Sequence, residues 1–492
     1  MLFRSEIWSI VGFGLAQALR LVGVSGPAAA TLHRWIWGIH AGLCVAFFVL
    51  LPWKFFGHMI YGLASWARRR ERPQAALATV PLATPALDAQ SPPGAVTWEQ
   101  FTRLDLLQAD ACTTCGRCNS VCPAHAAGTP LKPREIVLGL RAAVDFGTAA
   151  PLTTWIEDAA LWSCTTCGAC NAVCPVGIDV YDKIVELRRG RVETGLVPEA
   201  ARQVFDGTLA DSNPFQRPAS ERLAWAGAFS PPIARGDEPI ELLYWIGCAG
   251  SFDPDGRSVT QAMIKILNHL RIDYRILGDR ERCSGDPARR LGEEGLFQEL
   301  ARHNLGLFDR HRVRRILTHC PHCFNTFRNE YHHLRAGADG APAPTYEVVH
   351  HTQFLAEMIG QGRLRLSAAD SGSVTFHDPC YLGRGNGIVD APRDVLRRAG
   401  ANLIEMPRRG AASFCCGAGG GAMWMEVGGR ERIENLRARE AAQTGAATVA
   451  TGCPFCKGML LAGSESANAA AAPATRMRVR DVSELVVEAE GL

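Results

Sequence analysis

Lysine is scarce in this sequence, and nucleotide-binding fingerprints are missing from it. Only five of its 52 basic side chains are lysines, and the 492 residues carry a net charge of +3. We attribute the excess of arginine to genome composition, and the near balance of charge argues against a nucleic-acid partner. Gly12 and Gly14 have no strand before them, and the glycines of residues 417–421 follow a double cysteine, so neither group predicts a flavin or nicotinamide site. The chain alone therefore lacks the means to oxidise an organic substrate.

Charge is also missing from one long run, residues 35–53. At about 1.5 Å per residue this run just spans a hydrocarbon core of roughly 30 Å. Trp35 and Trp53 mark its two ends, as interfacial aromatic residues do. Arg68, Arg69, Arg70 and Arg72 follow, so the positive-inside rule predicts that the rest of the chain lies on the cytoplasmic side of a bacterial membrane.

An earlier apolar segment, residues 7–30, precedes this run and contains Gln17 and Arg20. It is either a second membrane helix, which would give a hairpin, or an interfacial helix. Residues 27–30 also resemble a signal-peptide cleavage region. We disfavour export, because reduced thiols do not persist in an oxidising compartment.

His40 lies inside the apolar run and His58 follows it. An ionisable residue in a membrane span is a candidate functional site, and a haem b held by His40 and His58 is the obvious hypothesis. The alternative is that both histidines lie near the interface or against a partner helix. A bis-histidine haem needs ligands from facing helices, and residues 7–30 contain no histidine, so this alternative is favoured.

The count of 18 cysteines is high, and 17 of them fall into tight, repeated groups. Such grouping in a long chain is typical of metal ligands rather than of disulfides. The exception is Cys44, which lies in the apolar run and is expected to be a buried small hydrophobe.

The strongest pattern is an internal repeat of cysteines. Residues 112–123 are CTTCGRCNSVCP and residues 164–175 are CTTCGACNAVCP. Both follow the spacing that binds a [4Fe–4S] cluster in ferredoxins, in which the fourth cysteine serves the other cluster. Zinc prefers two separated pairs of cysteines and is improbable here. The expected ligands are, for the first cluster, Cys112, Cys115, Cys118 and Cys174, and for the second, Cys164, Cys167, Cys170 and Cys122.

A second repeat occupies the C-terminal half. A strand-like segment ends at Cys248, Cys283 follows 35 residues later, and Cys320 and Cys323 form a C-x-x-C pair after another strand-like segment. The same order and spacing recur as Cys380, Cys415 with Cys416, and the pair Cys453 and Cys456. Short β-branched strands alternate with helical segments, which predicts α/β units with the cysteines at the carboxyl ends of strands.

The two halves differ by one thiol, because Ser284 stands where the second half has Cys416. Four cysteines in the first half could hold a further cubane cluster, whereas five in the second could hold an opened, non-cubane one.

Polar residues lie next to these cysteines in the sequence. His377 and Asp378 precede Cys380, and His319 and His322 flank Cys320; we favour hydrogen bonding to cluster ligands over proton donation as their role. Asp286, Arg289 and Arg290 could bind a partner, compensate cluster charge, or form a solvated loop.

The expected fold is α+β and multidomain: an N-terminal membrane helix or hairpin, a helical two-cluster ferredoxin module whose runs are joined by helix over 132–162, and two α/β domains. The proline-rich linker has no helical or strand period and is expected to tether the membrane part. The expected boundaries are 1–66 for the membrane segments, 67–96 for the linker, 97–215 for the ferredoxin module, and 240–365 and 373–490 for the α/β domains.

On these motifs the chain resembles the cysteine-rich CCG-domain family, which includes heterodisulfide reductases and the iron–sulfur subunits of glycolate oxidase and anaerobic glycerol-3-phosphate dehydrogenase. The strings HDPCYLGR, GDPARR, CPHCFNTF and CCGAGGGAMW are most similar to membrane-bound iron–sulfur oxidoreductases linked to electron-transfer flavoprotein, including the dimethylglycine-catabolism B type. The resemblance implies a non-cubane cluster at the five-cysteine site and a ferredoxin module that connects it to a partner.

Two departures from the family matter. Family members carry a longer, cytochrome-b-like membrane domain, whereas this sequence offers only one or two membrane spans. Haem bound by this chain is therefore in doubt, and a separate membrane cytochrome subunit is a candidate partner. Ser284 leaves the first α/β domain without a full non-cubane ligand set.

Three functions fit these observations. The first is a membrane-anchored oxidoreductase that passes electrons from a flavoprotein, either electron-transfer flavoprotein or a flavin dehydrogenase, to quinone. The second is a heterodisulfide reductase-like thiol–disulfide reductase. The third, an iron–sulfur assembly or sensor protein, ranks last because four sites in a row favour electron transfer.

Overall fold

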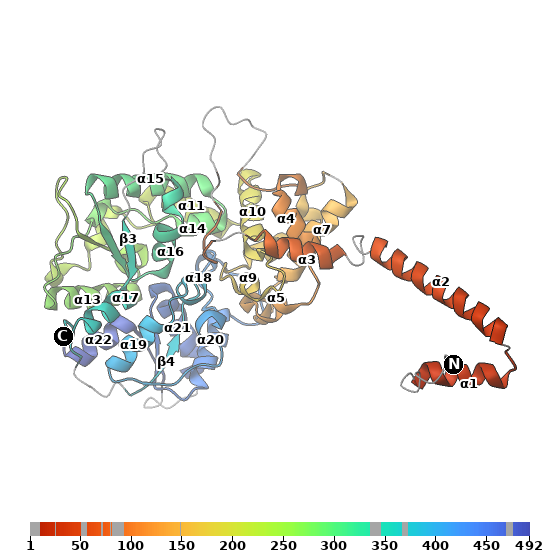
Figure 1. The fold of residues 1–492 in the computed structure, drawn as a ribbon. Helices are drawn as coiled ribbons and strands as arrows, with labels where there is room; N and C mark the ends of the chain where they lie inside the picture. The colour runs from red at the N-terminus through yellow and green to blue at the C-terminus, as the bar shows by residue number, and fades with distance from the viewer. Residues whose placement is uncertain are drawn as a thin grey trace.

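The structure is a computed structural model, and it describes residues 10–24, 26–50, 57–69, 72–78, 80, 93–147, 149–334, 346–366, 372–468 and 476–492. Figure 1 shows three parts along the chain: a pair of N-terminal helices that stand apart, a helical module, and a larger α/β body. The expected α+β multidomain fold is confirmed. Trp53, Arg70 and most of the proline-rich stretch, residues 81–92, lie outside the described residues.

The N-terminal pair consists of α1 (Ile10–Leu21) and α2 (Gly26–Leu50). Helix α2 has 25 residues, none of them buried, and it is long and apolar enough to cross a membrane. It begins nine residues before the run predicted from the missing charges, because residues 26–34 continue the helix and Pro27 is tolerated in a first turn. The segment that resembled a cleavage region is therefore the first turn of α2. Cys44 is exposed on this helix, so the expectation that it is buried is wrong.

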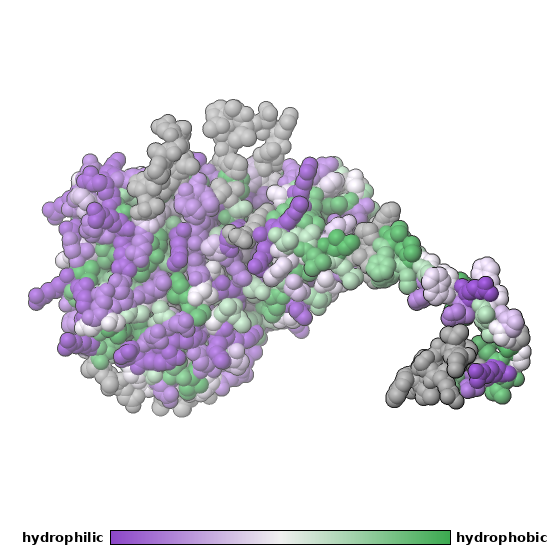
Figure 2. Space-filling model, in the orientation of Figure 1, coloured by the Kyte–Doolittle hydropathy of each residue, from purple (hydrophilic) through white to green (hydrophobic). Residues whose placement is uncertain are grey.

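Helix α3 (Gly57–Ala67) follows and packs on the helical module. Its buried face contains Gly62 and Ser65, and the Ser65 hydroxyl donates a hydrogen bond to the carbonyl of Val176 over 2.7 Å. The opposite face is apolar and exposed, and Figure 2 shows hydrophobic surface at this end of the module. That face consists of Met59, Ile60, Leu63 and Trp66.

The helical module contains no strand within its described residues. Its helices are α4 (Arg103–Asp110), α5 (Arg117–Ser120), α6 (Pro123–Ala126), α7 (Pro133–Phe146), α8 (Asp158–Trp162), α9 (Ala169–Val173), α10 (Val180–Glu193) and α11 (Glu199–Asp211). The helix predicted after residue 132 is α7, which ends at Gly147 in the left-handed conformation. Pro151 then keeps the chain irregular, so the second predicted segment forms only a short turn and α8.

The α/β body has two parallel sheets that repeat one another. The first has the order β1 (Leu242–Trp245), β2 (Arg315–Thr318) and β3 (Glu347–His350). The second has the order β5 (Asn402–Leu403), β4 (Ser373–His377), β6 (Thr448–Thr451) and β7 (Arg478–Asp481). Apolar side chains of both sheets, including Leu317 and Phe376, share one core, so the two halves pack as one body.

Helices cover both sheets (Figure 1). In the first half they are α12 (Gly247–Phe252), α13 (Pro254–His269), α14 (Asp286–Leu291), α15 (Glu294–Arg310), α16 (Pro321–Asn329) and α17 (His351–Gly360). In the second half they are α18 (Gly383–Asn386), α19 (Asp390–Arg398), α20 (Ile433–Ala442), α21 (Pro454–Asn468) and α22 (Val482–Glu490).

The cysteines lie at the carboxyl ends of the strands, as predicted. Cys320 follows β2 and is the N-cap of α16, whose first residue is Pro321; α21 likewise begins at Pro454, directly after Cys453. Proline favours the first position of a helix, where its missing N–H costs nothing. Each C-P-x-C motif is thus a strand-to-helix turn that puts two thiols at the mouth of a sheet.

Candidate metal centres

Two hollows in the helical module are each lined by four cysteines. Each hollow takes three thiols from one C-x-x-C-x-x-C run and the fourth from the other run, which is the grouping expected from the sequence. The first contains Cys112, Cys115, Cys118 and Cys174. The second contains Cys122, Cys164, Cys167 and Cys170.

The loops around both hollows share one backbone conformation. Thr114 and Thr166 have φ of 55° and 48°, and the glycines two residues later have φ of 76° and 72°. A β-branched residue with positive φ is strained, so its recurrence at equivalent positions indicates a functional requirement. The turn aims the Thr166 N–H at the Sγ of Cys164 over 3.3 Å, as expected for a loop that donates hydrogen bonds to ligand sulfur. Soft thiol donors with such N–H groups fit an iron–sulfur cluster.

Burial favours the neutral form of several thiols in these hollows while no metal is bound, but not of the exposed Cys115, whose pKa a backbone hydrogen bond from Arg117 lowers. Burial raises the pKa of Cys118 and of Cys164 to about 11, although the nearby Arg188 guanidinium opposes the shift at Cys164. Because only thiolates bind metal, cluster assembly must release protons here.

The second half of the α/β body gathers five buried thiols at the ends of β4 and β6: Cys380, Cys415, Cys416, Cys453 and Cys456. The Sγ atoms of Cys416 and Cys456 lie 3.3 Å apart. The N–H of Gly417 donates to the Sγ of Cys415 over 3.3 Å. Hydrogen bonds with Cys415 and Cys456 lower the pKa of Cys416 to about 5, which favours its thiolate.

The first half repeats this arrangement with four buried thiols. Cys248 shares a hydrogen bond with Cys283, and Cys320 shares one with Cys323. The N–H of Gly285 donates to the Sγ of Cys283 over 3.5 Å, which matches the bond from Gly417 in the second half. Ser284 lies beside Cys323, with 3.5 Å between Oγ and Sγ.

The cysteine groups follow one another through the molecule. Cys167 of the second hollow packs against Cys380 and Cys415, and its thiol shares a hydrogen bond with Cys415. All the cysteines of the two α/β halves except Cys380 and Cys415 lie in one apolar core, where Cys320 is close enough to Cys453 to feel its charge. The two hollows share the core of the helical module. The structure therefore brings all four predicted groups into one continuous series.

The glycine-rich loop after Cys416 makes a close backbone approach to the helical module. A Cβ atom at Gly419 would lie 2.4 Å from the carbonyl oxygen of Thr165, and one at Gly420 would lie 2.3 Å from that of Cys164. Gly419 and Gly420 therefore let the five-cysteine site lie against the loop of the second hollow.

Arg188 was not singled out from the sequence, yet it ties these loops together. Its guanidinium is fully buried and donates to the carbonyls of Leu161, Cys164, Arg290 and Gly420 over 2.7–3.1 Å. These acceptors are neutral, so Arg188 places a positive charge beside Cys164. Such a charge suits a neighbouring anionic cluster, and only the fold reveals it.

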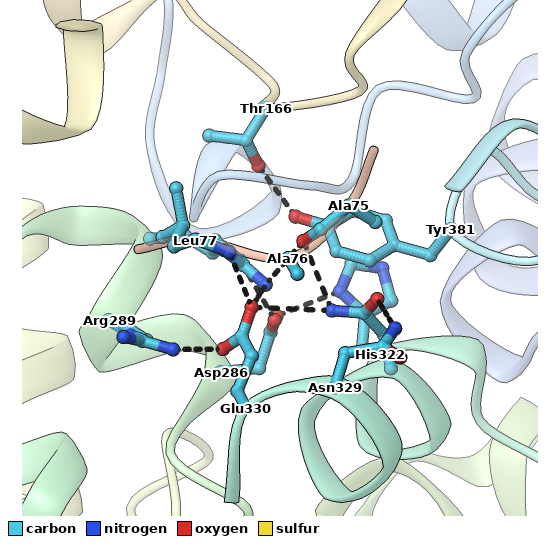
Figure 3. A network of polar contacts seen from close by, with 12 residues as sticks. Ala75, Ala76, Leu77, Thr166, Asp286, Arg289, His322, Asn329, Glu330 and Tyr381 are labelled. Atoms are coloured by element: carbon cyan, nitrogen blue, oxygen red, sulfur yellow. Dashed lines mark hydrogen bonds and ion pairs between the residues drawn. The ribbon is translucent and has the colours of Figure 1, made fainter. Parts of the chain in front are cut away.

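Asp286, Arg289 and Arg290 are buried on α14, so the interpretation as a solvated loop is wrong. Glu330 pairs with both arginines over 2.6 Å, and Asp286 lies 2.8 Å from His322. Burial would raise the pKa of Asp286, but His322 and Arg290 outweigh it and hold the value at about 2. Figure 3 shows this network beside Tyr381, whose hydroxyl lies 2.9 Å from Thr166 Oγ1.

The same network holds part of the predicted linker. Residues 75–77 are buried, and Figure 3 shows this segment crossing above Glu330. The N–H of Leu77 donates to Glu330 over 3.1 Å, and Arg290 donates to the carbonyl of Ala75 over 3.2 Å. This stretch of the linker is therefore fixed between the helical module and the α/β body rather than free.

The histidines near the cysteines lie in the protein interior. His322 stacks on Tyr381 with 4.3 Å between ring centroids, and His319 lies 2.9 Å from the hydroxyl of Tyr244. His377 accepts a hydrogen bond from Arg437, and burial together with that cation lowers the pKa of His377 to about 3. These contacts agree with roles in hydrogen bonding.

His40 and His58, the candidate haem ligands, lie on different helices. His40 is on α2, where its Nε2 is 3.6 Å from the Sγ of Cys44, and His58 is the second residue of α3. Among the described residues no hydrogen bond or ring contact joins the two histidines. Haem binding stays a prediction from the sequence.

Comparisons with known proteins agree with this division of the chain. A model described as "Cysteine-rich domain" matches residues 242–328 and 374–461, and one described as "4Fe-4S dicluster domain" matches residues 108–178. These ranges contain all 17 grouped cysteines. The matches support [4Fe–4S] clusters as cofactors of the chain.

Three relatives are similar over most of the chain. A probable membrane-anchored ferredoxin of Chromohalobacter salexigens is 39% identical over 82% of this chain and 63% of its own length, which is less than two thirds of that relative. The EtfAB:quinone oxidoreductase of Syntrophomonas wolfei is 30% identical over 97% of this chain and 71% of its own length. One subunit of the dihydromethanophenazine:CoB–CoM heterodisulfide reductase of Methanosarcina barkeri is 31% identical over 83% of this chain and 98% of its own length.

Proposed function

The chain belongs to the CCG-domain family of iron–sulfur oxidoreductases, and from that membership we propose that it passes electrons from a flavoprotein to the quinone of a membrane. The single observation that carries the proposal is the series of four cysteine groups that begins beside α3 and ends in the α/β body. Electron-transfer flavoprotein is the donor we favour, because the relative from Syntrophomonas wolfei is named for a reaction between such a protein and quinone.

Each cysteine group has a role in this proposal. The two hollows of the helical module hold the first and second [4Fe–4S] clusters, and the five cysteines from Cys380 to Cys456 hold a non-cubane cluster. The four thiols from Cys248 to Cys323 hold a further cluster. The N–H groups of Thr166, Gly285 and Gly417 support the bound sulfur atoms.

The position of α3 supports a direction for the electron transfer. This helix follows the candidate membrane span, and its buried face contacts Val176, which lines the first hollow. Its exposed face is apolar, and Arg68 and Arg69 follow at its end, as in helices that lie at a membrane surface. The first cluster would therefore lie nearest the quinone, on the cytoplasmic side, and electrons from the flavoprotein would enter through the α/β body.

The chain's own residues exclude water along this route. Cys167, Cys380 and Cys415 meet in a packed contact with Tyr381. Arg188 and Arg384 both donate to carbonyls of the second hollow's loop, at Cys164 and Cys167. Rigid, dry contacts of this kind keep successive clusters close and at a fixed distance.

The test uses the full chain, purified without oxygen and placed in lipid vesicles with a short-chain ubiquinone. Photoreduced electron-transfer flavoprotein is the electron donor, and quinone reduction is followed optically. We expect quinone reduction that needs both proteins. Reduction of the iron–sulfur signals without any reduction of quinone would contradict the proposal.

A second candidate function is thiol–disulfide reduction at the five-cysteine site. The close approach of Cys416 and Cys456 and the similarity to a heterodisulfide reductase subunit favour it. Reduced chain incubated with a mixed thiol disulfide, such as that of coenzyme M and glutathione, would release free thiols under this alternative. The flavoprotein-to-quinone proposal predicts no thiol release.

A further inference from the structure

His377 ends β4 inside the five-cysteine group. Its side chain is fully buried, and one of its ring nitrogens lies within 4.8 Å of the Sγ atoms of Cys416 and Cys456. Arg437 binds one of the two ring nitrogens, because its Nε donates a hydrogen bond to Nδ1 of His377 over 2.9 Å. Nε2 is buried and has no hydrogen-bond partner among the described residues. The nitrogen left to face the sulfur atoms is therefore Nε2.

Arg437 also decides which nitrogen carries the proton. A guanidinium can only donate, so Nδ1 must present its lone pair, and the imidazole then carries its hydrogen on Nε2. Glu440 holds Arg437 in place over 2.8 Å. A nitrogen that carries hydrogen cannot bind iron, so His377 faces the cysteines as a donor rather than as a metal ligand.

We propose that His377 is a positioning residue of the five-cysteine site, whose Nε2–H is directed at the sulfur atoms of Cys416 and Cys456, would donate to one of them when a cluster is bound, and would raise the reduction potential there. The inference rests on the proposed assignment of a cluster to these cysteines. One-electron reduction adds one negative charge that the sulfur atoms share, and a hydrogen bond from a buried donor stabilises the more negative state. Losing the donor should therefore make reduction harder.

The first half of the α/β body supports the inference independently. Trp245 precedes Cys248 by three residues, as His377 precedes Cys380, and its indole Nε1 is also buried without a partner among the described residues. A Cβ atom at Gly247 would lie 3.6 Å from Nε1 of Trp245 and 3.5 Å from Sγ of Cys323. Both halves thus place an N–H donor at the end of the first strand, beside the second cysteine of the C-P-x-C motif.

The test compares wild type with His377→Phe and His377→Gln in the full chain, loaded with iron under anaerobic conditions. The midpoint potential of the five-cysteine site is measured by redox titration with electron paramagnetic resonance. We expect His377→Phe to lower the ratio of reduced to oxidised site at least tenfold at a given applied potential. For one electron, this corresponds to a midpoint potential that is about 59 mV more negative. His377→Gln, which keeps an N–H donor, should recover part of that shift.

His311→Phe is the matched control. His311 is also buried, but Glu238 and Arg280 occupy both of its nitrogens, and it should change stability without changing the potential. An unchanged midpoint in His377→Phe would overturn the inference. So would a strong, directly bonded nitrogen coupling in the wild-type spectrum, which needs no variant and would identify His377 as an iron ligand. Absence of any iron signal from the wild-type site would instead overturn the cluster assignment.

Discussion

The Oγ atom of Ser284 lies 3.5 Å from the Sγ atom of Cys323, in the place where the second half brings Cys416 within 3.3 Å of Cys456. The two halves are therefore the same site with one thiol exchanged for a hydroxyl. Because the N–H bonds from Gly285 and Gly417 are also equivalent, the backbone of the first half is already shaped for a fifth thiol.

Ser284→Cys should accordingly convert the first site. We expect the iron–sulfur spectrum to gain a second signal like that of the five-cysteine site, with little loss of stability because sulfur replaces oxygen at a preformed position. Paramagnetic resonance and iron quantitation on the full chain measure this. Ser251→Cys is the control, since Ser251 is buried in the same domain but its hydroxyl donates to the carbonyl of Gly247. A spectrum identical to wild type would contradict the equivalence of the two halves.

Gly420→Ala should separate the five-cysteine site from the second hollow. The new methyl group would lie 2.3 Å from the carbonyl oxygen of Cys164, and φ of 65° strains any residue but glycine. We expect slower electron transfer between the ferredoxin clusters and the five-cysteine site in rapid-freeze experiments, and a loss of about 1–3 kcal/mol of stability from the strained backbone.

Gly428→Ala is the matched control for that variant, because a Cβ atom there meets nothing within 4 Å. It should behave as wild type in both measurements. Equal transfer rates for the two variants would show that the contact of the glycine-rich loop does not matter for electron transfer.

Iron-free protein should lose stability at alkaline pH. Burial raises the pKa of Cys164 from 9.0 to about 11, so the thiols of the unfolded chain ionise first as the pH rises. The stabilisation from the neutral thiol is complete below pH 9 and disappears as the pH passes 11. Thermal melting of iron-free and iron-loaded protein at pH 7, 9 and 10.5 tests this. The melting temperature of the loaded protein should fall less with rising pH, because its thiolates are bound. Parallel losses in the two forms would contradict the explanation.

Leu63 on α3 should lie in the membrane surface. Its side chain is 76% exposed on the apolar face of that helix, whereas Leu209 on α11 is 65% exposed in the α/β-facing part of the helical module. A photoreactive benzoylphenylalanine at position 63 should form adducts with lipid in phosphatidylethanolamine–phosphatidylglycerol vesicles, and the same group at position 209 should not. Mass spectrometry identifies the adducts. Equal lipid labelling at both positions, or none at 63, would contradict the orientation.

The cysteine spacing predicted most of the features that depend on residues close together in the sequence. The grouping at the hollows, the strand-to-helix turns and the repeat of the two halves follow from motifs whose residues are close in sequence. Contacts between distant segments were not predictable in this way. Arg188, the partner of His377 and the burial of residues 75–77 all depend on side chains brought together only by packing. The burial of Asp286, Arg289 and Arg290 was not predictable for the same reason. Glu330, the partner of both arginines, lies about 40 residues away, and His322, the partner of Asp286, lies 36 residues away.

Metal analysis of the full chain purified without oxygen tests the central claim most directly. The account predicts about eight iron atoms and as many sulfides from the two ferredoxin clusters, with further iron at the five-cysteine site, and signals of reduced [4Fe–4S] clusters in the paramagnetic resonance spectrum. Colourless protein that contains zinc or no metal at these thiols would contradict it.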